Sequence, residues 1–66
     1  MPMLRKLRKA LGLSIAGVTL RTGIHSSTIC QIERFKLAGS ANVKATLAEF
    51  YGKPQKALFD EVGMAK

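Results

Sequence analysis

The sequence has 66 residues, a single cysteine and a formal net charge of +7. A chain of this length builds one small core, and 47% hydrophobic residues are too many for a disordered tail. One cysteine excludes an intrachain disulfide, and no apolar run approaches the roughly 20 residues of a membrane-spanning helix. We therefore expect one soluble, cytoplasmic domain over residues 1–66, without membrane association and with residues 62–66 as a flexible tail.

Charge is unevenly distributed along the chain. Basic residues occur from Arg5 to Arg21, whereas the first acid is Glu33. The other acids, Asp60 among them, lie toward the C-terminus. This asymmetry favours a polyanion such as nucleic acid on the N-terminal half. A solvated basic face without a partner would explain it equally well.

The first predicted helix ends at Gly12, because glycine commonly follows the last helical residue. Leu4, Leu7 and Leu11 recur at helical spacing and predict its apolar face. Arg8 lies on the flank of that face, where an unpaired guanidinium is costly. We therefore expect an acidic partner for Arg8.

A second helix is predicted over residues 15–22. Ser14 is its expected N-cap, and Gly23 supplies the following turn because positive φ costs glycine little. The side chains expected in the core are Ile15, Val18 and Leu20.

The third helix is predicted to begin near Ser26. Ile29 and Ile32 recur on its inner side, and Glu33 shares their flank. We predict that Glu33 pairs with Arg8. Two helices joined by a short glycine-containing turn are typical of a helix-turn-helix, whose second helix enters the DNA major groove.

Two further helices complete an all-α prediction of five helices and no strand. One spans residues 41–51 between a Ser40 cap and Gly52, and the other begins at Pro54 with Leu58 facing inward. Phe59 and Val62 are expected to remain partly exposed and to suggest a partner surface. The predicted homodimer interface comprises Leu58, Phe59 and Val62.

The single histidine and the single cysteine do not predict a metal or catalytic site. A metal site needs three or four ligands, and the carboxylates are scattered along the chain. His25 and Cys30 are five positions apart and do not face each other on a helix. We expect no enzyme activity, cofactor, metal or small-molecule substrate.

Several short motifs occur in order between residues 3 and 61. They are Leu13-Ser14, Gly23-Ile24, the run SSTICQIER ending in Glu33-Arg34, LAEFYG at 47–52, and Leu58. This set resembles the Cro/cI-type helix-turn-helix regulators of phages and bacteria, the XRE family. The resemblance implies a compact five-helix, lambda-repressor-like DNA-binding domain with a recognition helix over about residues 26–35. It also implies a buried salt bridge at the positions of Arg8 and Glu33.

The resemblance further implies which residues contact DNA. Positions that read base edges correspond to His25, Ser26, Ser27 and Gln31. Positions that contact phosphates correspond to Ser14, Arg34, Lys36, Ser40, Asn42 and Lys44. Glutamine can pair bidentately with adenine, whereas serine is permissive, so Gln31 is the best candidate for sequence discrimination.

Three positions depart from the family pattern. Ile15 stands where the family usually has a glutamine that contacts phosphate, so that contact is expected to be missing. Thr19 replaces a small residue, which predicts altered packing between the second and third helices. Phe35 replaces a glycine, which predicts either a longer third helix or an exposed aromatic side chain.

These features together predict a transcriptional regulator that binds double-stranded DNA. We expect a Cro-like repressor that binds a pseudo-palindromic operator as a homodimer in a bacterial or phage-infected cell, at the nucleoid. Its half-sites would be about 34 Å apart. A chain of this size has no room for an effector domain, so promoter occlusion is the simplest mechanism. An excisionase-like or architectural DNA-binding factor and an antitoxin-like protein-binding module remain alternatives.

Overall fold

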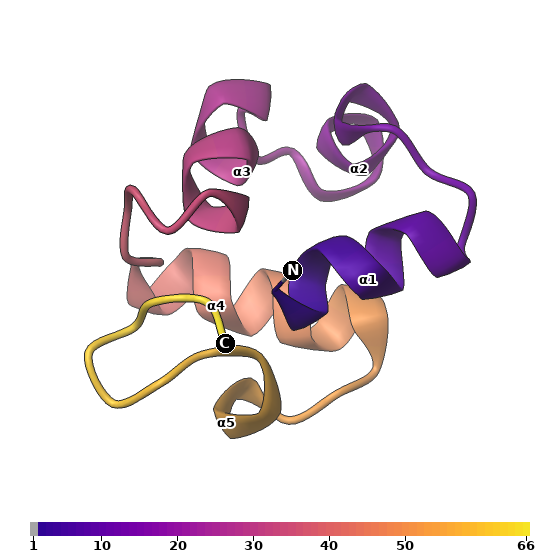
Figure 1. The fold of residues 1–66 in the computed structure, drawn as a ribbon. Coiled ribbons are helices and arrows are strands. Elements are labelled where there is room, and N and C mark those ends of the chain that lie inside the picture. Colours follow the sequence, from indigo (N-terminus) through magenta and orange to yellow (C-terminus); the bar gives the residue numbers. More distant parts are fainter. Residues whose placement is uncertain (1) are drawn as a thin grey trace.

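Five short helices account for the fold in the computed structural model, which describes residues 2–66 (Figure 1). In chain order they are α1 (Met3–Ala10), α2 (Ile15–Thr22), α3 (Ser26–Glu33), α4 (Ala41–Tyr51) and α5 (Gln55–Leu58). Within residues 2–66, β structure is limited to an isolated antiparallel bridge between Phe59 and Ala65. The all-α class is confirmed. No helix in this range is long and apolar enough to cross a membrane.

The ends of α2 and α4 lie where local chemistry predicts them. Ser14 and Ser40 each accept a hydrogen bond from the backbone N–H three residues on, at 3.0 and 3.3 Å. Gly23 and Gly52 end the same helices with φ of 77° and 67°. That region of φ is costly for other L-residues, so these glycines stop the helices. Both N-caps and both stops are confirmed.

The hydrophobic core lies between α2 and α3 on one side and α1, α4 and α5 on the other (Figure 1). Each helix contributes at least one buried apolar side chain to it. The buried residues are Leu4, Val18, Ile24, Ile29, Ile32, Leu47, Leu58, Phe59 and Ala65. Burying one of the larger side chains stabilises the fold by about 1.5–3 kcal/mol, so this small set has to hold every helix.

Two leucines expected in the core are exposed instead. Leu11 is 58% exposed because α1 ends at Ala10 and Leu11 follows as its C-cap. Leu20 is 85% exposed because it lies about 200° around the helix from the buried Val18. The prediction was wrong for both residues.

The predicted homodimer interface requires a correction. Leu58 and Phe59 are only 0% and 3% exposed, so their side chains belong to the core and cannot form a contact surface. Both can be buried because α5 ends at Leu58 and Phe59 is extended, with φ of −132° and ψ of 148°. Consecutive side chains in a helix would point in different directions. Val62 is exposed, as predicted.

Residues 62–66 pack against the domain, which contradicts the predicted flexible tail. The Asp60 carboxylate accepts hydrogen bonds from the N–H groups of Val62 and Met64 at 3.0 and 2.9 Å. This turn reverses the chain and brings Ala65 beside Phe59, where Ala65 is buried. The Lys66 carbonyl then accepts a hydrogen bond from the Met3 N–H. The C-terminal segment therefore closes the core against the start of α1.

Candidate nucleic-acid interface

A three-residue turn connects α2 to α3 at one end of the molecule (Figure 1). The Thr22 hydroxyl donates to the Val18 carbonyl at 2.8 Å and accepts from the Ile24 N–H at 3.3 Å. Ile24 itself is buried, so the turn is anchored to the core directly after Gly23. These contacts fix the start of α3 relative to the end of α2.

Helix α3 has a buried side and a polar, exposed side. Ile29 and Ile32 are 3% and 0% exposed and face the core. We use the name α3 surface for the exposed residues of this helix and its two ends: His25, Ser26, Ser27, Gln31 and Arg34. Thr28 and Cys30 are half-buried beside them. The α3 surface thus presents hydrogen-bonding side chains and one cation.

Glu33, the acid of α3, does not belong to this surface because it lies in a buried ion pair. Arg8 Nε and Nη2 donate to the two carboxylate oxygens of Glu33 at 2.9 and 3.0 Å. Arg8 Nη1 donates to the Leu13 carbonyl at 3.0 Å. The hydrogen bond to Glu33 raises the pKa of Arg8 above its ordinary value, although burial of the guanidinium opposes this effect. The predicted pairing is confirmed, and it ties α1 and the following turn to the last residue of α3.

Tyr51 lies in the same buried region as this ion pair. The sequence predicted only that its side chain faces the core. With Glu33 and Ile32 it borders a narrow apolar gap that has no room for a water molecule. Burial and, to a lesser extent, the Glu33 carboxylate together raise the pKa of Tyr51 to about 12, although Arg8 acts in the opposite direction. The Tyr51 ring also packs edge-on against Phe50, with ring centroids 4.9 Å apart.

Most of the residues predicted to contact phosphate are exposed, and they lie at helix ends. Arg34 and Lys36 directly follow α3, whereas Ser14 begins α2 and Ser40 and Asn42 begin α4. The serine hydroxyls already act as helix caps.

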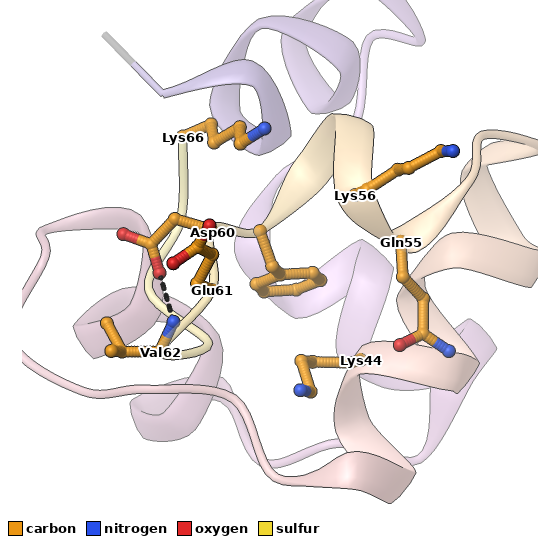
Figure 2. Close-up of a pocket in the computed structure, with 8 residues that line it drawn as sticks. Lys44, Gln55, Lys56, Asp60, Glu61, Val62 and Lys66 are labelled. Carbon is orange, nitrogen blue, oxygen red and sulfur yellow. Dashed lines mark hydrogen bonds between the residues drawn. The ribbon is translucent and has the colours of Figure 1, made fainter.

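Lys44 lies elsewhere. Its side chain is half-buried and lines an open groove between α4, α5 and residues 59–66 (Figure 2). Gln55, Lys56 and Asp60 line the same groove. Lys44 therefore lies beside the C-terminal segment, in contrast to the exposed residues at the helix ends.

The three departures from the family pattern have visible consequences. Ile15 is half-buried and packs against the core, so its side chain serves packing. The Thr19 hydroxyl is buried and has no hydrogen-bond partner among residues 2–66. Phe35 does not lengthen α3, because the helix ends at Glu33. Its aromatic side chain is instead 51% exposed, which is the second of the two predicted outcomes.

Phe35 has a φ of 61°, in the left-handed region where glycine is usual. The Phe35 N–H donates to the Ile32 carbonyl at 3.2 Å, and the Lys36 N–H donates to the Gln31 carbonyl at 2.9 Å. This pair of hydrogen bonds is the Schellman pattern that ends helices, with Phe35 in the position that glycine normally occupies. The phenylalanine is therefore held in a strained conformation with its ring exposed.

The histidine and the cysteine remain apart from any cluster of metal ligands. His25 is exposed at the start of α3, and Cys30 is half-buried one turn later. Within the described residues, no three His, Cys, Asp or Glu side chains gather closely enough to hold a metal ion.

The α3 surface is therefore the main candidate for a functional site. It is a polar helix face at one end of a small basic domain. Its charge is set by the burial of Glu33 with Arg8 and by Arg34 and Lys36 at its C-terminal end. The chain matches no protein-family model, no curated protein and no solved structure.

Proposed function

We propose that the chain is a sequence-specific DNA-binding transcriptional regulator with α3 as its recognition helix. It acts as a Cro-like repressor, binding a pseudo-palindromic operator as a homodimer. The observation that carries the proposal is the α3 surface, which exposes Ser27, Gln31 and Arg34 while the acid of the same helix is paired and buried. This arrangement suits a helix that enters the major groove.

Electrostatics support a polyanionic ligand at this surface. An exposed glutamate on α3 would repel phosphates, but Glu33 is 6% exposed and its charge is balanced by Arg8. Arg34 and Lys36 at the end of α3 can neutralise phosphates and release counterions. No side chain caps the N-terminus of α3, so its first N–H groups are available to an anion.

The side chains of the α3 surface divide into reading and positioning roles. The Gln31 amide can donate to and accept from an adenine edge at once, which gives it sequence information. His25, Ser26 and Ser27 can contact base edges with less discrimination. Arg34 and Lys36, together with Ser14, Ser40 and Asn42 at helix starts, would contact the backbone and set the register.

Selection of bound sequences from a random DNA pool tests the proposal most directly. We expect a pseudo-palindromic consensus whose half-sites are about 34 Å apart, the distance between successive major grooves. Absence of DNA binding even at low salt, where phosphate contacts are strongest, would overturn the proposal. That result would favour a protein-binding role for the same surface.

Substitution of Gln31 tests its reading role. We expect Gln31→Ala to cost about 1–3 kcal/mol on the selected site and to relax preference at one base pair. Gln55→Ala is the matched control, because Gln55 is exposed in the groove away from α3. If Gln31→Ala weakens all sequences equally, Gln31 contacts the backbone and does not read a base.

A further inference from the structure

The phenylalanine at position 35 is not required by the end of α3. Its φ of 61° lies in the left-handed region. Its N–H and that of the next residue donate to the carbonyls of Ile32 and Gln31, which closes the last turn of the helix. Glycine would make the same two hydrogen bonds without the strain that a Cβ brings at this φ. Termination of α3 therefore does not explain an aromatic side chain here.

The hydrophobic core does not use the Phe35 ring either. Phe35 is 51% exposed, and among residues 2–66 it belongs neither to the core nor to the partly buried apolar residues packed against the core. A single exposed apolar side chain is common on protein surfaces. Exposure combined with a strained backbone is less ordinary, because such strain is concentrated at functional sites. The two observations together point to a contact that the ring makes with a partner.

The sequence neighbours of Phe35 favour a nucleic acid as this partner. Arg34 and Lys36 lie on either side of it, and both side chains are exposed. The acid of α3, Glu33, is neutralised in the buried ion pair, and the next acid in the sequence is Glu49. An aromatic side chain between two cations suits a polyanion that also offers apolar atoms.

The backbone at Phe35 lies against the turn of α3 that carries Gln31. The Lys36 N–H donates to the Gln31 carbonyl at 2.9 Å, at the start of the connection to α4 (Figure 1). Successive base pairs are about 3.4 Å apart, so a ring beside Gln31 can reach the base pair that Gln31 reads or a neighbouring one. The apolar group that base edges present in the major groove is the thymine methyl, and phenylalanine is among the side chains that contact it.

We propose that the Phe35 ring contacts a thymine methyl group in the major groove, at or beside the base pair that Gln31 reads. This inference rests on the proposed function, because it takes α3 as the recognition helix. It adds an apolar, specificity-determining contact to the hydrogen bonds of the α3 surface. It also gives a role to a position where the family pattern has glycine, since burial of the ring on DNA would offset the strain.

Deoxyuridine isolates the thymine methyl, because it differs from thymidine by that group alone. Each thymine of the selected operator is replaced in turn, in both half-sites, and the affinity is measured by fluorescence anisotropy. At one position near the Gln31 base pair, the wild type should bind about fourfold more weakly for each methyl group removed. Phe35→Gly should bind the thymine duplex about tenfold more weakly than the wild type and should not distinguish thymine from deoxyuridine at that position.

Two further variants control for folding and for general loss of apolar surface. Phe35→Asn should give the same result as Phe35→Gly, because both residues tolerate this φ, and urea unfolding checks that both variants keep their fold. Leu11→Ser is the matched control, since Leu11 is also an exposed apolar residue directly after a helix, at 58% exposure. It should keep the wild-type affinity and the wild-type preference for thymine.

The outcomes separate this inference from the proposed function. An operator without thymine within about two base pairs of the Gln31 position would overturn the Phe35 contact. Equal losses of the wild type and Phe35→Gly on the deoxyuridine duplexes would overturn it as well. Both results leave the proposed function intact, because the wild type still binds its operator. Failure of the wild type to bind any duplex at low salt rejects the proposed function, and the Phe35 contact with it.

Discussion

Removal of the Arg8 guanidinium is the most severe single change that the structure predicts. Arg8→Ala leaves the Glu33 carboxylate, which is 6% exposed, without either of its two charged hydrogen bonds. It also removes the donor to the Leu13 carbonyl, which helps to hold the turn between α1 and α2. The packing of the aliphatic part of the buried side chain is lost as well.

These losses add up to a large part of the stability of the domain. Breaking a buried ion pair by deleting one partner costs about 3–5 kcal/mol, chiefly because the remaining charge stays buried and unpaired. A domain of this length has a free energy of unfolding of about 3–10 kcal/mol. We therefore expect Arg8→Ala to be largely unfolded at room temperature or to lose most of its resistance to urea.

Urea unfolding followed by far-ultraviolet circular dichroism measures the effect, and a double substitution identifies its cause. Arg8→Met combined with Glu33→Leu removes both charges and fills the space with apolar atoms. We expect this double variant to be far more stable than Arg8→Ala and close to the wild type. A loss below about 1 kcal/mol in Arg8→Ala, or simple additivity of the two single substitutions, would refute the reasoning.

Other substitutions test local features of the same fold. Thr19→Val removes a buried hydroxyl that has no partner among residues 2–66, so the free energy of unfolding should rise by about 1 kcal/mol in urea titrations. Phe35→Gly should be about 1 kcal/mol more stable than Phe35→Ala, since φ of 61° favours glycine; the opposite order would show that Phe35 is unstrained. The folded state keeps the Tyr51 proton to a pKa of about 12, whereas the unfolded chain releases it near the ordinary tyrosine pKa of 10.0. Stability should therefore fall between these pH values, by about 1 kcal/mol after solvent screening, and Tyr51→Phe should remove that part of the loss. Because the chain has one tyrosine and no tryptophan, ultraviolet titration of tyrosinate reports the Tyr51 pKa directly.

The helix ends and the ion pair were predictable because each depends on local chemistry. A serine cap or a glycine stop acts within one turn, so Ser14 and Gly23 identify the ends of α2 without knowledge of the rest of the fold. The pairing of Arg8 with Glu33 followed from a different constraint. A charge on the flank of a core needs a partner, and few acids were available to Arg8.

The course of the C-terminal segment was not predicted, because it depends on contacts between distant residues. Phe59 is buried because the chain reverses after it and brings Ala65 alongside. A signal for the reversal was present in the sequence, since Asp60 followed by Gly63 is a combination that turns favour. Without that reversal, neither the burial of Phe59 nor the position of Lys44 in the groove could be inferred.

The exposed face of α3 was predictable from helical periodicity. The contacts that hold the end of α3 in place were only partly predictable. Gln31 and Arg34 are exposed because Ile29 and Ile32 occupy the opposite side of the helix. The carboxyl end of α3 is held by the ion pair between Arg8 and Glu33, and the chain then turns at the strained Phe35. A residue without strain at position 35 could end the helix equally well, but a glycine there would remove the exposed ring. The comparison of Phe35→Gly with the wild type therefore separates the two roles. If the exposed ring contributes to binding, the glycine variant should keep its fold in urea titrations but bind the selected operator more weakly; equal affinity would show that the ring has no role in binding.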